Sequence, residues 1–371
     1  MTGRTTGRPA ERAPADFDLA VVGAGITGAM VAHLAAEGDR SLRVLTVDGG
    51  APGATHLSAG LDVPTGHTPQ KRAMAARSSA VYARLRAERP TLPIRPADTY
   101  WLIGRAGLGR LRESMAGPRL TEAGAGGGAR LDGVLPGVRQ GADRLLLRSG
   151  GGTHADVGRL TEHLLAGQRR RPGSEVWSGL PVTGVRPRDG GYELTCGGEA
   201  RAVAGKVVVA TGAWALAGPF GDVARARGLR IKKVAALHLG VRPPAGAPVL
   251  IFDDDDAFLL PWREKGYWLF SFTSDHWDGS PEDGPPELSP EDHRTAAGIL
   301  REHVPALAGK IRGGRAFYDG YTPDRMPLVE EVEGWPGVVL ALGGNGSGYR
   351  LAPAVAERAL ELLGPREGGR S

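Results

Sequence analysis

The most regular hydrophobic pattern lies near the start of the chain, over residues 18–48. A short apolar run at 18–22 predicts a buried strand, and the amphipathic segment that begins near Ile26 predicts a helix. A second apolar run, at 44–47, predicts another strand. The pattern therefore predicts a strand–turn–helix–strand unit, which is typical of an α/β protein.

The turn in this unit has the spacing of a dinucleotide-binding motif. Gly23, Gly25 and Gly28 follow the strand as G-x-G-x-x-G, and Asp48 ends the second strand. We expect the three glycines to permit, in order, a sharp turn, close approach to a pyrophosphate and close packing of the helix on the sheet. The carboxylate of Asp48 can accept hydrogen bonds from a ribose diol. The motif itself does not separate FAD from NAD.

The rest of the chain alternates between segments with the apolar pattern of a strand and segments with that of a helix. Strands are predicted at 175–176, 182–186, 192–196, 206–210 and 337–342. Helices are predicted at 71–89, 154–167, 289–307 and 351–363, and Ser289 and Pro290 suit the start of the third. Several strand-like runs over 231–272 predict a separate antiparallel sheet.

Three segments lack a periodic apolar pattern. Residues 1–15 predict a disordered tail, and residues 116–141 predict a surface loop of low complexity. Residues 49–64 are rich in Gly, Ala and Ser, so we expect this loop to pass close to a ligand. The acidic run from Asp253 to Asp256 predicts a solvated hairpin turn, because adjacent side chains of an extended chain point in opposite directions. We therefore expect no metal site.

Composition narrows the possible classes of protein. With 371 residues the chain is long enough for two domains, and its net charge of +5 comes from scattered arginines, so nucleic-acid binding is not expected. The single cysteine, Cys196, excludes an intrachain disulfide and predicts a buried strand residue. No apolar run is long enough for a membrane span. We expect a soluble cytoplasmic protein.

Five segments, in this order, resemble the FAD-dependent D-amino-acid oxidase superfamily, which includes glycine oxidase, sarcosine oxidase and D-amino-acid dehydrogenases. They are VVGAGITG, GATHLSAGL, VVVATGAWA, YTPDRMPLV and ALGGNGSGYRLAP. The resemblance implies FAD as the cofactor and an α/β fold with two domains. These are a Rossmann-like, glutathione-reductase-type FAD domain (16–80, 150–225 and 320–371) and an α+β substrate domain with a mixed sheet (81–149 and 226–319).

The resemblance also implies which residues contact FAD. In such proteins the two terminal glycine segments hold the cofactor, the Ala-Thr-Gly turn lies beside it, and the loop after the second strand passes the isoalloxazine. Val182 would pair its backbone with adenine. The implied FAD contacts are Gly23, Ala24, Gly25, Ile26, Thr27, Gly28, Asp48, Gly49, Ser58, Ala59, Gly60, Leu61, Val182, Ala210, Thr211, Gly212, Trp214, Gly343, Gly344, Asn345, Gly346, Ser347, Gly348 and Tyr349.

Candidate substrate residues follow from the same resemblance. Arg350 matches the basic residue that holds the substrate carboxylate in the sarcosine-oxidase branch. His56 lies in the loop expected to pass the flavin, and Tyr318 and Tyr321 are candidates for a pocket wall or for simple packing. Trp268 aligns with the oxygen-activating lysine of that branch, which leaves the electron acceptor open between oxygen and another carrier.

Three further departures from the family pattern shape the expectations. Asp319 stands where many glycine-oxidase-like members carry an arginine that anchors the substrate. Phe317 and Leu57 stand where other members attach FAD covalently through Cys or His. We therefore expect FAD to be bound without a covalent link.

The function implied is oxidation of an amine, amino acid or imino acid, by transfer of a hydride from the carbon next to nitrogen to flavin N5. The substrate would be a small molecule, possibly anionic. An alternative is a 2-hydroxy-acid dehydrogenase, for which His56 is the candidate base. An alternative of another class is a dinucleotide-binding partner or regulator without turnover.

Overall fold

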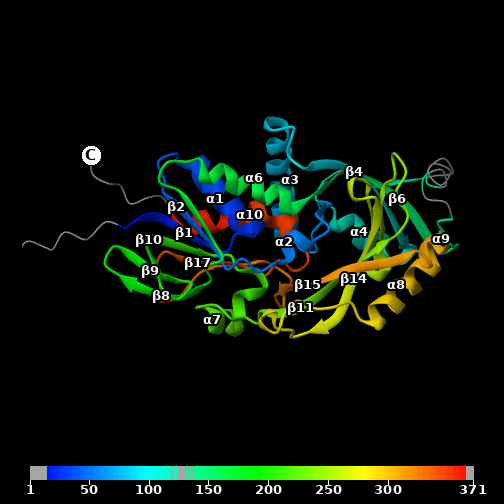
Figure 1. Cartoon of the computed structure of the whole chain (residues 1–371). Coiled ribbons are helices and arrows are strands. Elements are labelled where there is room, and N and C mark those ends of the chain that lie inside the picture. Colours follow the sequence, from blue (N-terminus) through cyan, green and yellow to red (C-terminus); the bar gives the residue numbers. More distant parts are fainter. Residues whose placement is uncertain (1–14, 118–119, 124–130, 132–133, 135–136, 365–371) are drawn as a thin grey trace, which may run out of the picture.

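The computed structural model describes residues 15–117, 120–123, 131, 134 and 137–364. Within these residues the chain forms two β-sheets and passes between them four times (Figure 1). The predicted tail over residues 1–15 lies almost wholly outside the described residues, and so does much of the predicted loop over 116–141.

The first sheet is built around the dinucleotide motif. Five of its strands are parallel, and they bring segments from the start, middle and end of the chain side by side. The strand order is β16 (Leu328–Glu331), β17 (Val338–Leu342), β10 (Ala200–Val209), β1 (Phe17–Val22), β2 (Val44–Asp48) and β7 (Glu175–Ser178). An antiparallel hairpin of β8 (Val182–Arg188) and β9 (Gly191–Cys196) extends from β10.

Helices cover one face of the first sheet (Figure 1). They are α1 (Ile26–Gly38), α3 (Pro69–Glu88), α6 (Val157–Arg169) and α10 (Gly348–Leu363), and the short α2 (Ala54–Leu57) lies between the two sheets. The other face packs against the β8–β9 hairpin and α7 (Gly221–Ala226). Cys196 is fully buried in this second core, as the sequence predicted.

The second sheet is mixed and lies beside the first. Its order is β15 (Ile311–Tyr321), β11 (Arg230–Leu239), β14 (Tyr267–Trp277), β13 (Ala257–Trp262), β12 (Val249–Phe252), β4 (Ile94–Gly104), β6 (Arg144–Ala155) and β3 (Leu61–Asp62), with β5 (Thr121–Glu122) paired to β6. Helices α8 (Pro290–His303) and α9 (Pro305–Ala308) cover its outer face. The remaining short helices are α4 (Leu108–Ser114), η1 (Arg105–Gly107), η2 (Gly212–Leu216), η3 (Asp253–Asp255), η4 (Arg263–Lys265) and η5 (Pro281–Asp283).

Several predicted element boundaries differ from the structure; the strand predicted at 206–210, for example, spans Ala200–Val209. The helix predicted from residue 154 begins at Val157, because β6 continues to Ala155 and Asp156 caps the helix by accepting the Arg159 N–H. The helix predicted over 289–307 is divided at Pro305, since a proline disfavours helical backbone in the residue before it. The last helix begins at Gly348, three residues earlier than predicted.

The acidic run from Asp253 to Asp256 is the turn between β12 and β13, as predicted. Each carboxylate has its own partner, in order the Arg110 guanidinium, the Gly104 N–H, His303 and the Thr273 hydroxyl. The four side chains therefore stabilise separate contacts. In the described part of the chain, no helix is long and apolar enough to cross a membrane.

A buried ion pair fastens α8 to the second sheet. The Lys233 ammonium lies 2.7 Å from the Asp292 carboxylate, and both side chains are only 6% exposed. Burial by itself would raise the pKa of Asp292, but hydrogen bonds from Lys233 and Ser289 hold that pKa below its usual value. Asp292 also completes a capping box with Ser289.

Replacing Asp292 by alanine should therefore destabilise the fold. Removing one member of a buried pair leaves the other charge without a partner, which costs about 3 to 5 kcal/mol. The measurement is the free energy of unfolding of Asp292→Ala in urea, compared with Glu291→Ala, which changes an exposed carboxylate in the same helical turn. Equal losses in the two variants would contradict this assignment.

Candidate active site

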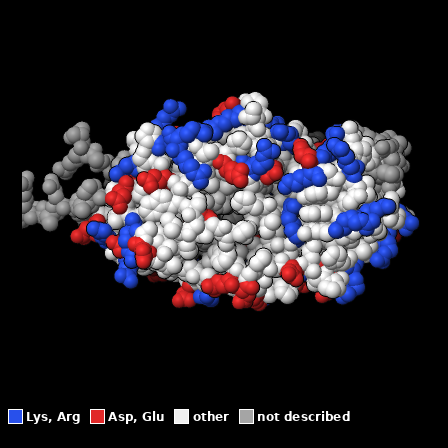
Figure 2. All heavy atoms as spheres, viewed as in Figure 1, with Lys and Arg blue, Asp and Glu red and all other residues white. Residues whose placement is uncertain are grey.

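A cavity of about 1510 Å³ lies between the two sheets. Its walls come from the carboxyl ends of β1, β2, β10 and β17, from the loop after β2, and from one face of the second sheet. Ligands of open parallel sheets bind at this edge of the strands. Figure 2 shows a hollow at the centre of the molecule, with basic and acidic side chains interspersed around it.

Nearly all residues that the sequence assigned to the cofactor line this cavity; Gly28 does not. A Cβ on Gly28 would collide with the carbonyl of Gly23, so this glycine permits close packing of α1 on the turn. Gly23 has φ of 105° and lies against the Ala210 carbonyl, where a Cβ has no room. The motif is thus shaped both by backbone strain and by close contact.

The N-terminus of α1 opens toward the cavity beside Thr55. The Thr55 hydroxyl accepts the Ile26 N–H at 3.0 Å, and a Cβ on Gly25 would lie 3.0 Å from the same oxygen. A helix N-terminus carries free N–H groups and partial positive charge, so it suits a phosphate. Sequence reasoning missed Thr55, although it lies inside the quoted GATHLSAGL segment.

Asp48 is held in place by backbone N–H groups. Its carboxylate accepts from Ala24 at 2.9 Å and from Gly50 at 2.7 Å. Each oxygen retains acceptor capacity for a ribose hydroxyl. Gly49 and Val182 line the same end of the cavity.

The loop between α2 and β3 is fixed from the second sheet by Arg315. Its guanidinium donates to the carbonyl oxygens of Leu57 at 2.6 Å and Ser58 at 3.2 Å. Burial and the nearby Arg315 lower the pKa of His238 to about 4, so His238 is neutral beside this cation. The sequence contained no signal for Arg315, because the two carbonyl groups that it binds lie more than 250 residues away.

Among the buried hydroxyls in the cavity walls that have no protein partner in the described part of the chain, two lie outside the α-helices. They are Ser58 Oγ, in the loop after α2, and Thr211 Oγ1, in the Ala-Thr-Gly turn. Buried polar atoms are normally hydrogen-bonded. These two are therefore available to a polar ligand that fills the cavity.

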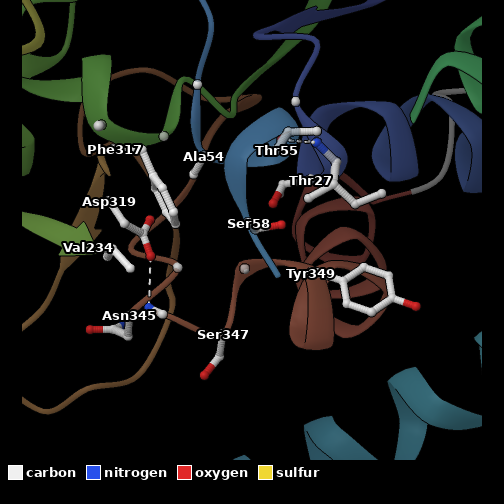
Figure 3. Close-up of a pocket in the computed structure, with 18 of the residues that line it drawn as sticks. Thr27, Ala54, Thr55, Ser58, Val234, Phe317, Asp319, Asn345, Ser347 and Tyr349 are labelled. Carbon is white, nitrogen blue, oxygen red and sulfur yellow. Dashed lines mark hydrogen bonds between the residues drawn. The ribbon is translucent and has the colours of Figure 1, made fainter. Parts of the chain in front are cut away.

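The last glycine segment folds into a tight turn at the start of α10. Gly343, Asn345 and Gly346 all have positive φ, and Asn345 Oδ1 accepts the Thr322 N–H at 2.9 Å. The first N–H groups of α10 have no partner inside the helix. The Tyr349 ring stacks on Tyr82 and points away from Asn345 and Ser347 (Figure 3).

Asp319 supports this turn. Its carboxylate accepts N–H groups from Gly346 and Gly320, both at 2.8 Å (Figure 3). Burial raises the pKa of Asp319 to about 6, although both hydrogen bonds act in the opposite direction. The residue that replaces the usual arginine is thus a buried carboxyl bound to the backbone.

Arg350 lies half-buried in the cavity wall. Its Nη1 donates to the Val63 carbonyl at 3.0 Å and to Thr65 Oγ1 at 2.8 Å, and its Nη2 donates to Ser347 Oγ at 2.7 Å. The Nε–H has no partner among the described residues. Burial lowers the pKa of Arg350, and the nearby Asp62 carboxyl opposes that shift.

One face of the second sheet forms the opposite wall. The pairs Lys232–Asp319 and Val234–Phe317 lie side by side in β11 and β15, and all four residues line the cavity. Because side chains alternate along a strand, Tyr321 lies on the same face as Asp319. Figure 3 shows Phe317, Asp319 and Val234 together beside Asn345.

Two candidate residues lie on the other face of this sheet, which corrects their predicted place in the site. Trp268 is three residues from the cavity-lining Ser271, so it points the opposite way, and it is 1% exposed in the core under α8. Tyr318 lies between Phe317 and Asp319 and packs against Gly279. Neither residue lines the cavity.

His56 lies at the edge of the cavity. Its side chain is exposed, and its ring lies against Gly158 in the first turn of α6. The structure therefore brings together Arg350 and Tyr321 at the cavity wall, with His56 at the rim.

Comparisons with known proteins agree with this geometry. The chain is similar to glycine oxidase from Geobacillus kaustophilus, at 18% identity and TM-score 0.77 over 94% of each chain. It is also similar to L-α-glycerophosphate oxidase from Mycoplasma pneumoniae, solved with FAD bound, at 16% identity and TM-score 0.75 over 94% of this chain and 95% of that one. These likenesses show the fold.

A curated relative matches only in part. The tRNA 5-methylaminomethyl-2-thiouridine biosynthesis bifunctional protein of Caulobacter vibrioides is 34% identical over 122 residues, which cover 32% of this chain and 19% of that protein. The matched part thus spans about a fifth of the relative's length.

The model of the FAD dependent oxidoreductase family, DAO, matches residues 18–362, almost the entire chain. FAD is the cofactor of this family, and the glycine turns, helix N-terminus and unpartnered hydroxyls described above suit a dinucleotide. The chain therefore belongs to the family of FAD-dependent oxidoreductases called DAO.

Proposed function

We propose that this oxidoreductase acts on an amine, amino acid or imino acid and removes hydrogen from the carbon next to nitrogen. The observation that carries the proposal is Arg350, a half-buried cation in the cavity wall whose Nε–H is buried without a protein partner among the described residues. A carboxylate of the substrate can accept that N–H in a charge-assisted hydrogen bond.

The proposed cofactor contacts run along the cavity. Gly23, Gly25 and the N-terminus of α1 would hold the pyrophosphate, and Asp48 would accept from the ribose. Ser58 and the first turn of α10 would face the ring system. Bound there, FAD supplies the two-electron acceptor that no protein side chain provides.

The protein positions the substrate and excludes water. Val234 and Phe317 give the wall an apolar surface, and Arg350 would orient an anionic substrate beside it. The N-terminus of α10 contributes positive partial charge, which stabilises negative charge that develops near it. A substrate that arrives as a free amine needs no side-chain base for this reaction.

Oxidation of a 2-hydroxy acid is the alternative, and the fold does not decide between the two. The similar glycerophosphate oxidase is named for a hydroxyl substrate and the similar glycine oxidase for an amine. A hydroxyl group needs a base, and the candidate His56 is exposed with its ring against Gly158. This position favours the amine.

The first experiment tests the glycine turn between β1 and α1. Gly25→Val should yield folded protein without FAD, because the added side chain would crowd Thr55 Oγ1 and cover the helix N-terminus. The measurement is flavin absorbance per protein after purification, with Gly38→Val as the control, since a Cβ there meets nothing within 4 Å. Normal FAD content in folded Gly25→Val would remove this turn from the site.

The second experiment concerns the link to FAD. Phe317 lines the cavity at the place of the attaching cysteine, and its ring cannot form that bond. Acid precipitation should therefore release the yellow colour into the supernatant, and the intact mass should equal that of the chain. A precipitate that stays yellow would show a covalent bond elsewhere.

The third experiment concerns the substrate. Amines or amino acids, and not the matching 2-hydroxy acids, should bleach the flavin without oxygen. In Arg350→Ala, half-saturation should require roughly 10 to 200 times more substrate, since a charged hydrogen bond is worth about 1.5 to 3 kcal/mol. Arg350→Lys should recover part of this, because an ammonium lacks the planar fork.

A matched control separates the effect of Arg350 on substrate binding from its effect on the loop that carries Thr65. Thr65→Val removes one contact of Arg350 and leaves its charge in place, so it should change half-saturation by less than Arg350→Ala does. An unchanged saturation curve in Arg350→Ala, with FAD still bound, would overturn the role of Arg350. Bleaching by hydroxy acids alone would favour the alternative reaction.

A further inference from the structure

Five further lysines and arginines line the cavity; Arg230 and Lys233 are paired with acids, whereas Lys71, Lys232 and Arg325 have no ion-pair partner among the described residues. Arg325 is exposed, so it marks the cavity mouth, and it lies in the turn after β15. Its φ is 56°, a left-handed conformation that is uncommon outside glycine. Such strain persists only where the surrounding structure imposes it, and it concentrates at functional sites.

The turn that carries Arg325 is fixed by contacts with the start of α3. The Lys71 ammonium donates to the Arg325 carbonyl at 2.6 Å, and a ring nitrogen of His67 lies 3.1 Å from the Asp324 carbonyl. Inside the turn, the Thr322 hydroxyl donates to the Met326 carbonyl at 2.6 Å. The backbone of Arg325 therefore has a set position, while its guanidinium has no hydrogen-bond or ion-pair partner among the described residues.

Lys232 is the second cation without an anionic partner. It is only 5% exposed, and its ammonium lies 4.5 Å from the centre of the Trp277 ring and 5.5 Å from that of Tyr321. No carboxylate of the described chain lies within 4 Å of it, and no hydrogen bond holds it. Burial lowers the pKa of Lys232. The negative charges of Asp275 and Asp256 oppose that shift, and the positive charge of Arg325 adds to it.

Lys71 connects this mouth with Arg350. Burial and the positive charges of Arg350 and Arg325 together lower the pKa of Lys71 to about 8, although the Asp324 carboxylate acts in the opposite direction. Lys71 is thus close enough to both arginines for their charges to act on it. The cavity wall therefore carries a line of cations that repel one another, from Arg350 past Lys71 to Arg325 and Lys232.

A neighbouring arginine, in contrast, has an acidic partner. Arg230 also stacks on Trp277, but its guanidinium makes two hydrogen bonds to the Asp278 carboxylate, at 2.9 and 2.6 Å. Arg325 and Lys232 have no such acid. Bringing an oxyanion between them would relieve their repulsion and supply the missing hydrogen-bond acceptors.

We infer that Arg325 and Lys232 form a subsite for a second anionic group of the substrate, a carboxylate or a phosphonate-like oxyanion. The inference rests on the proposed function, because the first anionic group would bind Arg350. The substrate class is then an amine that carries two anionic groups. Tyr321 and Trp277 form the apolar side of this subsite.

The test measures how tightly simple acids bind to the oxidised holoenzyme. Binding is monitored through the change in flavin absorbance. Glutarate and valerate have the same chain length and differ by one carboxylate. Glutarate should bind roughly 10 to 100 times more tightly than valerate, because one charged hydrogen bond contributes enough binding free energy for a difference of that size. The corresponding phosphonate, 4-phosphonobutyrate, shows which oxyanion the subsite prefers, and a preference for either diacid supports the subsite.

Two variants should remove this preference and leave valerate binding within about 3-fold. Arg325→Gly suits the left-handed backbone, so it removes the charge without added strain. Lys232→Met keeps the apolar stem against Trp277. Arg242→Gln, an exposed charge change outside the cavity, should have no effect and controls for net charge.

The outcomes separate this inference from the proposed function. If the unaltered protein binds glutarate, 4-phosphonobutyrate and valerate equally, the subsite is overturned, and so it is by a preference that survives in both variants. Arg350→Lys should weaken both acids together. If Arg350→Lys weakens the binding of neither acid, Arg350 is not the substrate anchor that the proposed function requires. The preference for a diacid over valerate still tests Arg325 and Lys232 independently.

Discussion

Strand β15 is the element on which the rest of the site depends. Arg315 reaches the carbonyl oxygens of Leu57 and Ser58, and Asp319 accepts the N–H of Gly346. These partners belong to loops from opposite ends of the chain that both line the cavity. One strand of the second sheet therefore sets the positions of two loops that belong to the first.

The arrangement depends on burying charge next to backbone polar groups. A guanidinium offers several donors in one plane, so Arg315 can hold two successive carbonyls at once. Asp319 is a buried acceptor for two N–H groups, and its burial is costly enough to raise its pKa to about 6. Both side chains have polar partners, which lowers the cost of their burial.

Because Asp319 supports the glycine turn, the positive charges in the cavity wall lie at other positions. Many glycine-oxidase-like proteins have a cation at this position, and here the carboxyl supports the glycine turn instead. Cations that line the cavity come from other elements, among them Lys71 from α3, Lys232 from β11 and Arg350 from α10. Substrate recognition in this chain would therefore depend on a different wall of the cavity.

The sequence by itself determined the dinucleotide unit, because its contacts are local. Gly23, Gly25 and Gly28 are needed at fixed spacing by the backbone path from β1 to α1, and Asp48 ends the adjacent strand. Apolar patterning likewise identified most strands, and Ser289 with Pro290 marked the start of α8. These features depend on neighbours within a few turns or on one strand pair.

Only the tertiary structure decided which side chains face the cavity. Trp268 and Tyr318 were misplaced because one residue of register moves a side chain to the other face of a sheet. Arg315, Thr55 and Lys232 were missed because their partners come from distant segments. Packing two sheets against each other creates these contacts, and no local pattern in the sequence records which residues it brings together.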